Sequence, residues 1–92
     1  MERLKGKVAL ITGATGGQGS EEALLFASEG ARVVVAARSH EKGAALVNSI
    51  QQTGGEAMYI PLDVTSQEQW TRAVQIVSER YGALHILVNN AG

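Results

Sequence analysis

Four short apolar runs alternate along this 92-residue chain with three longer segments that have the composition and periodicity of helices. The apolar runs cover residues 7–12, 31–37, 57–62 and 84–88. Strands that are apolar on both faces and are joined by helices form parallel sheets with both faces covered. The sequence therefore predicts an α/β fold with the order β-α-β-α-β-α-β and right-handed crossovers.

Glycines mark the ends of all three predicted helices. Helices are expected over residues 20–29 and 39–53 and, behind a Thr65 cap, up to Gly82. Gly30, Gly54 and Gly82 follow them, where a residue in the left-handed conformation commonly ends a helix. The third helix has its apolar face at Trp70, Ala73, Val74, Val77 and Tyr81, and the second at Leu46, Val47 and Ile50.

Composition excludes several classes of protein. A net charge of -1 and a pI near 6.1 give no basic surplus for nucleic acid. The chain has no cysteine, and its histidines, His40 and His85, lack the spacing of a metal site. No apolar run is long enough for a signal peptide or a membrane span. We expect one cytoplasmic domain over residues 1–92, without metal, nucleic acid or membrane as partner.

The stretch ITGATGGQGSEE, residues 11–22, places four glycines within seven positions at the end of the first strand. Ligands of parallel sheets bind beyond the carboxyl ends of the strands, and a helix start offers free N–H groups to phosphate. The alternative is a turn that binds nothing. A P-loop, which binds nucleoside triphosphates, is excluded because Gln18 occupies the position of the last glycine in G-x-x-x-x-G-K-[ST] and no lysine follows. The pattern G-x-G-x-x-G fails at Glu22, its third glycine position.

The spacing T-G-x-x-x-G-x-G, at Thr12, Gly13, Gly17 and Gly19, resembles that of the short-chain dehydrogenase/reductase family. LDV at residues 62–64 and NNAG at residues 89–92 resemble two further motifs of that family in the same order. The resemblance covers essentially the whole chain. It implies a doubly wound Rossmann fold and an oxidoreductase that uses NAD(H) or NADP(H) on alcohols and carbonyls.

The resemblance also assigns roles to residues. It implies that the glycine turn holds the pyrophosphate, that Gln18 lies beside the nicotinamide ribose, and that Asn89 links strands. It implies that Asp63 accepts a hydrogen bond from the adenine amino group, although Asp63 is equally well explained as a turn residue ahead of Thr65. The implied cofactor-binding residues are Gly13, Thr15, Gly16, Gly17, Gln18, Gly19, Arg38, Ser39, Asp63, Val64, Asn90, Ala91 and Gly92.

The end of the second strand predicts a preference for NADP(H). NAD sites usually carry an acid there, which binds the ribose hydroxyls, whereas NADP sites carry a cation. Here Ala37 is followed by Arg38 and Ser39. Arg38 suits a 2′-phosphate through two parallel N–H bonds, with Thr15 as a further donor. The alternative is that Arg38 stacks on adenine in an NAD site.

Two features depart from the family pattern. Glu21 and Glu22 are expected in the first turn of the first helix, where they compete with a phosphate unless their side chains point to solvent. His85 lies in a predicted buried strand and is interpreted as structural.

No catalytic residue is predicted. The family uses a serine and a Tyr-x-x-x-Lys pair, but Asp63 follows Tyr59 at that spacing and His85 follows Tyr81. We therefore expect the cofactor-binding half of an oxidoreductase without the substrate half and without hydride transfer. The open edge of the fourth strand is expected to favour self-association. The alternatives are a stand-alone dinucleotide-binding module and a half-Rossmann structural unit.

Overall fold

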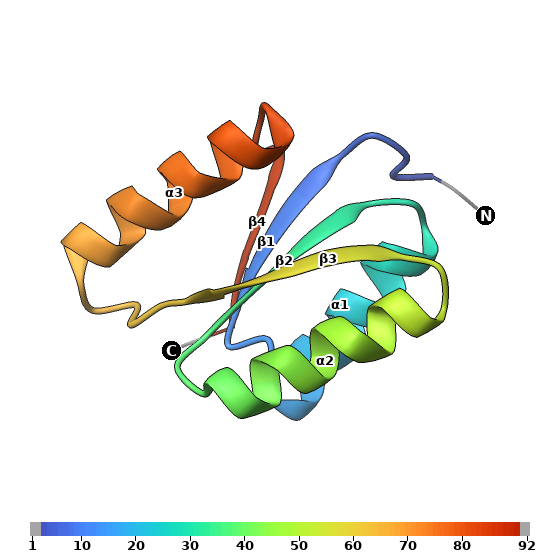
Figure 1. Cartoon of the computed structure of the whole chain (residues 1–92), viewed down its shortest axis with the longest axis horizontal. Coiled ribbons are helices and arrows are strands. Elements are labelled where there is room, and N and C mark those ends of the chain that lie inside the picture. Colours follow the sequence, from blue (N-terminus) through green and yellow to red (C-terminus); the bar gives the residue numbers. More distant parts are fainter. Residues whose placement is uncertain (1–2, 91–92) are drawn as a thin grey trace.

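The computed structural model describes residues 3–90 and has the predicted order of elements (Figure 1). The strands are β1 (Val8–Thr12), β2 (Arg32–Ala37), β3 (Glu56–Pro61) and β4 (Ile86–Asn89), and the helices are α1 (Gly17–Ser28), α2 (His40–Gln52) and α3 (Gln67–Tyr81). All strand pairs are parallel, in the spatial order β3-β2-β1-β4. The chain thus winds outward from β1 in both directions, which confirms the predicted doubly wound, Rossmann-like fold.

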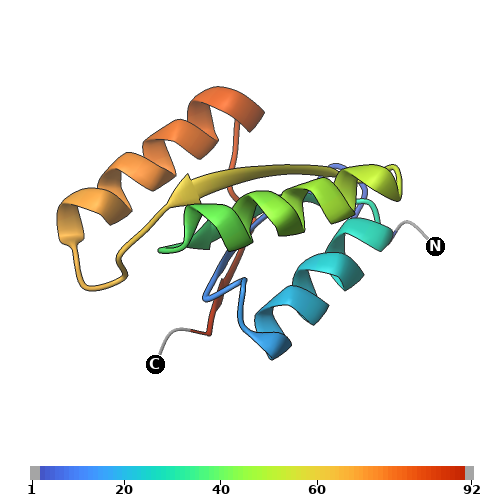
Figure 2. The ribbon, with the colours of Figure 1, turned by 60° about the horizontal axis from the view of Figure 1, so that its bottom comes forward.

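Helices cover both faces of the sheet. Helices α1 and α2 lie on one face and α3 lies on the other (Figures 1 and 2). Strand β2 shows why both layers are needed, because its side chains alternate between two apolar clusters. Val33 and Val35 pack with the α1 and α2 cluster, whereas Val34 and Ala36 pack with Ala73 and Val77 of α3. All of β1 is buried as well, as its apolar sequence predicts.

Two helices do not begin where the sequence predicted. Helix α1 begins at Gly17 and not at Ser20, with an extended Gly16 as its N-cap, so Glu21 and Glu22 lie beyond its first turn. Helix α3 is capped by Ser66 and not by Thr65, because the Ser66 hydroxyl accepts the Gln69 amide. At the other ends Gly30, Gly54 and Gly82 have φ of 95°, 89° and 83°, which confirms the predicted glycine stops.

Strand β4 is not the buried strand that its sequence suggests. Within residues 3–90 it pairs with β1 alone, and Leu87 is 55% exposed. Leu87 pairs with Leu10, whose side chain lies in the α3 cluster, so the uncovered apolar surface is on the α3 face. Val74 of α3, also expected in the core, is 41% exposed. His85 precedes β4 and is exposed. Its Nδ1 accepts a hydrogen bond from the Val8 amide at 3.0 Å.

Candidate functional site

The turn after β1 is built on glycines at its two ends. Gly13 has a φ of 61°, a left-handed conformation that favours glycine, and its carbonyl accepts the Gly16 amide at 3.2 Å. Gly19 is buried directly against this turn. A Cβ at position 19 would lie 2.3 Å from the Gly13 carbonyl oxygen and 2.9 Å from the Ala14 Cα. Since both are backbone atoms, position 19 has no room for a side chain.

The start of α1 presents backbone amides to open space. The first hydrogen bond of the helix runs from the Ser20 amide to the Gly16 carbonyl at 2.9 Å. The amides of Gly17, Gln18 and Gly19 precede it, in the turn where N–H groups have no partner within the helix. A Cβ on Gly17 would meet nothing within 4 Å. The open space at Gly17 and the positive end of the helix dipole together make this helix start suitable for an anion.

A cavity of about 440 Å³ lies at the carboxyl ends of β1, β2 and β3. Six of the predicted residues line it, namely Gly13, Thr15, Arg38, Ser39, Asp63 and Val64. Lys42, which the sequence did not single out, lines it as well. A larger cavity of about 560 Å³ lies at the amino ends of the strands, among the turns that follow α1 and α2. The smaller of these two cavities is the candidate ligand site, because it lies where parallel sheets bind ligands and meets the glycine turn.

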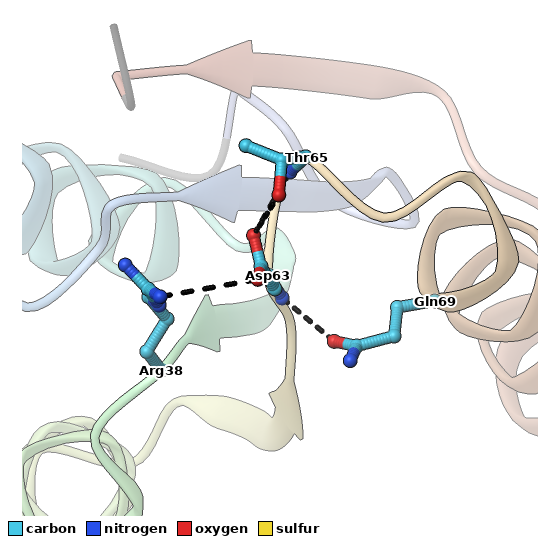
Figure 3. Close-up of polar contacts among 4 residues, drawn as sticks. All are labelled: Arg38, Asp63, Thr65 and Gln69. Carbon is cyan, nitrogen blue, oxygen red and sulfur yellow. Dashed lines mark hydrogen bonds and ion pairs between the residues drawn. The ribbon is translucent and has the colours of Figure 1, made fainter.

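Asp63 is held by residues on both sides of it (Figure 3). Its Oδ1 accepts from the Thr65 hydroxyl at 2.7 Å and from the Thr65 amide at 3.0 Å, and its own amide donates to Gln69 Oε1 at 2.7 Å. Its Oδ2 lies 3.9 Å from Nη2 of Arg38. The Thr65 hydroxyl, then the Thr65 amide and the charge of Arg38, hold the pKa of Asp63 below its usual range. Asp63 is thus a carboxylate with the turn role that the sequence allowed, and Oδ2 carries only the long Arg38 contact among residues 3–90.

Tyr59 fixes the end of β2 in a way that the sequence did not predict. Its hydroxyl donates to the Ala37 carbonyl at 2.8 Å, and burial raises its pKa, so it stays protonated. Its ring lies against Gly43 of α2, where a Cβ would come within 2.2 Å of the ring. His40 contacts the ring edge-on, with centroids 5.3 Å apart. These contacts position the backbone directly before Arg38.

Thr12 connects the carboxyl ends of β1 and β4. It is fully buried, and its hydroxyl donates to Asn89 Oδ1 at 2.8 Å, which gives Asn89 the strand-linking role expected for it. The Asn90 side chain donates to Glu22 Oε1 at 2.7 Å. Glu22 is therefore half-buried and bound to Asn90 and does not point to solvent, whereas Glu21 is exposed. The sequence-predicted residues Ala91 and Gly92 lie outside the described part of the chain.

The described residues contain neither a cluster of metal ligands nor a membrane-spanning helix. No group of three or more histidine, aspartate or glutamate side chains within residues 3–90 is arranged to hold a metal ion. None of the described helices is long and apolar enough to cross a membrane.

Comparison with known proteins matches this chain to one family over nearly its whole length. A family model described as short chain dehydrogenase matches residues 7–92. The 2,5-dichloro-2,5-cyclohexadiene-1,4-diol dehydrogenase of Sphingobium indicum is 44% identical over 98% of this chain and 36% of its own length. The 3beta-hydroxysteroid dehydrogenase of Mediterraneibacter gnavus is 39% identical over 100% of this chain and 33% of its own. This chain therefore spans about a third of the length of these curated relatives.

Solved structures show the same fold. A hydroxysteroid dehydrogenase from Escherichia coli superposes with a TM-score of 0.94 at 42% identity, covering 98% of this chain and 38% of that one. A metagenomic short-chain oxidoreductase in complex with NADP has a TM-score of 0.94 at 39% identity, covering 98% of this chain and 41% of that one. At these identities the likeness extends beyond the arrangement of the backbone.

Proposed function

The chain belongs to the short-chain dehydrogenase family, and on that premise we propose that it is the dinucleotide-binding portion of an oxidoreductase and prefers NADP(H) to NAD(H). The observation that carries the proposal is the glycine turn packed on Gly19, which leaves the first amides of α1 uncovered. When bound, the nicotinamide supplies the hydride chemistry. The residues of this chain bind and orient the cofactor.

The pyrophosphate lies, in this proposal, on the amides of Gly17, Gln18 and Gly19. The fit is supported by the open space at Gly17, where a side chain would otherwise occupy the approach to the backbone. The dipole of α1 adds a favourable interaction with negative charge. Gly13 and Gly16 shape the turn, and the exposed Gln18 extends toward the nicotinamide ribose.

The adenosine half occupies the cavity between the ends of β1, β2 and β3. Asp63, ionised because Thr65 holds its pKa low, accepts from the adenine amino group, and Val64 lies beside the ring. Asn90, fixed by Glu22, lies along the adenosine ribose. We extend the same proposal to Ala91 and Gly92.

The preference for NADP(H) rests on the charges at the end of β2. Ala37 stands where an acid would repel a 2′-phosphate, and Arg38 lines the cavity with an 81% exposed side chain. Thr15 and Ser39, which line the same cavity, are further donors. The structural neighbour in complex with NADP belongs to the same family and supports the choice of cofactor class.

The activity proposed for the whole protein is oxidation of alcohols or reduction of carbonyls, since the relatives named above are dehydrogenases. We place its acid and base groups outside residues 3–90. Tyr59 donates its hydroxyl to the Ala37 carbonyl, and Tyr81 packs under the Arg32 guanidinium at 5.5 Å. A stand-alone dinucleotide-binding module remains the alternative function, and a location in the cytoplasm stays a prediction.

The test is a fluorescence titration of the chain with NADPH and with NADH. We expect NADPH to bind more tightly, and Arg38→Gln to weaken NADPH binding by about tenfold while NADH binding changes little. Arg72→Gln is the matched control, because Arg72 is an exposed arginine of α3 that pairs only with Glu68 in the described chain. Tighter NADH binding would refute the preference, and binding of neither cofactor would refute the proposal as a whole.

Self-association through β4 is a separate proposal. The support is the exposed Leu87 on a strand that pairs on one side only within the described sheet. Light scattering over a range of concentrations should show a mass that rises with concentration, and Leu87→Lys should suppress the rise. A wild-type mass that stays constant would contradict this proposal.

A further inference from the structure

Lys42 lies in the first turn of α2 and lines the same cavity as Arg38 and Ser39. Its backbone is fixed, because the Lys42 amide donates to the Ser39 hydroxyl that caps the helix, at 3.2 Å. The turn that leads into this cap is itself held by Tyr59 through the Ala37 carbonyl. The base of the Lys42 side chain is therefore positioned by the fold, while its ammonium group is carried on a flexible stem.

The two cations that line the cavity differ in their partners. Arg38 faces the Asp63 carboxylate at 3.9 Å, so part of its charge is already balanced (Figure 3). Within residues 3–90, no ion pair involves Lys42. Glu41, the acidic residue directly before Lys42, is exposed. Lys42 thus brings an unbalanced positive charge to a cavity that holds the carboxylate of Asp63.

We propose that Lys42 is a second cation for the 2′-phosphate and helps to determine the preference for NADP(H). This inference rests on the proposed dinucleotide function. A 2′-phosphate carries about two negative charges at neutral pH, more than one arginine balances, especially one shared with a carboxylate. Arg38 provides the planar fork and Lys42 provides a point charge that adjusts its position. The positive end of the α2 dipole, at the start of the helix, also favours the negative charge of the phosphate.

The test compares 2′,5′-ADP with 5′-AMP by isothermal titration calorimetry. These ligands differ only in the 2′-phosphate, so nicotinamide contacts do not enter the comparison. We expect Lys42→Gln to weaken 2′,5′-ADP binding about tenfold, the range for one charge-assisted hydrogen bond, and to change 5′-AMP binding by less than about twofold. Raising the salt concentration should also weaken 2′,5′-ADP binding less in the variant than in the wild type.

Lys7→Gln is the matched control, since it removes the same charge from the residue before β1, at the opposite end of the strands. It should leave both affinities unchanged. Equal weakening of both ligands by Lys42→Gln, or no weakening, would overturn the assignment of Lys42. If the wild type binds NADPH but does not distinguish 2′,5′-ADP from 5′-AMP, the assignment also fails while dinucleotide binding stands. If no dinucleotide binds, both proposals fail.

Discussion

Adding one methyl group at position 19 or at position 17 should separate the folding role of the glycine turn from its binding role. At position 19 the new Cβ would lie 2.3 Å from the Gly13 carbonyl oxygen, and no flexible side chain is available to move away. The turn or the whole start of α1 must shift by about an ångström. Overpacking of this kind costs about 1–3 kcal/mol, more than the gain of up to ~1 kcal/mol for alanine over glycine in a helix.

The expected result is a loss of about 1–2 kcal/mol in the free energy of unfolding of Gly19→Ala. In a domain of this size that lowers the melting temperature by roughly 5–15 °C. Gly17→Ala provides the contrast, because its Cβ meets nothing within 4 Å and its cost should stay within about 0.5 kcal/mol. In the proposed binding mode that Cβ occupies space close to the pyrophosphate, so NADPH binding should fall at least tenfold.

Urea denaturation followed by circular dichroism measures the first effect, and NADPH fluorescence measures the second. The geometry of the turn is wrong if Gly19→Ala is as stable as the wild type. The placement of the pyrophosphate is wrong if Gly17→Ala is stable and binds NADPH as tightly as the wild type.

Two further substitutions test the neighbouring turns. Gly43→Ala should destabilise the chain by about 1–3 kcal/mol, because its Cβ would come within 2.2 Å of the Tyr59 ring; helix propensity alone predicts a gain of up to ~1 kcal/mol, so the sign measured in urea decides between the two. Thr65→Val removes the hydroxyl that contributes most to the low pKa of Asp63, so this pKa should rise toward the usual carboxyl value in an NMR titration. The stability that Asp63 contributes is fully present above its unfolded pKa and is lost as the pH falls to its folded pKa. In the variant this contribution should be smaller, and its loss should be complete at a higher pH. An unchanged Asp63 pKa would contradict the assigned hydrogen bond.

The sequence predicted the elements of this fold well because their signals are local. Apolar runs located β1 and β2, and glycines after each helix located its end, since both effects act within a few residues. The start of α1 was misplaced for the same reason. Four glycines within residues 13–19 resemble an irregular turn, although Gly17 and Gly19 are already helical. Thr65 and Ser66 are equally good caps by residue type. In the structure the Thr65 hydroxyl donates to Asp63, and the Ser66 hydroxyl caps the helix.

The candidate site was predictable where it follows from motif spacing and not where it depends on distant contacts. The motifs located Gly13 and Asp63, and the end of the second strand located Arg38. All three residues line one cavity. They gave no sign of the bond between Glu22 and Asn90, which joins residues 68 positions apart. They did not indicate Lys42 either, because its place in the cavity depends on how α2 packs. Likewise β4 has the composition of a buried strand, and its exposure follows from its position at the edge of the described sheet.

The contacts around the cavity hold its shape without requiring a ligand. Thr65 and Gln69 fix Asp63, the Trp70 indole donates to the Val64 carbonyl at 2.8 Å, and Tyr59 fixes the end of β2. A site whose groups are already ordered loses less conformational freedom on binding, and this strengthens affinity without any added contact. The pair of Arg38 and Asp63 acts in the opposite direction, since a 2′-phosphate must draw Arg38 from the carboxylate. At 3.9 Å and with Arg38 largely exposed, that pair is weak, so in the proposed binding mode the competition costs little and the net charge of Arg38 and Lys42 selects the cofactor.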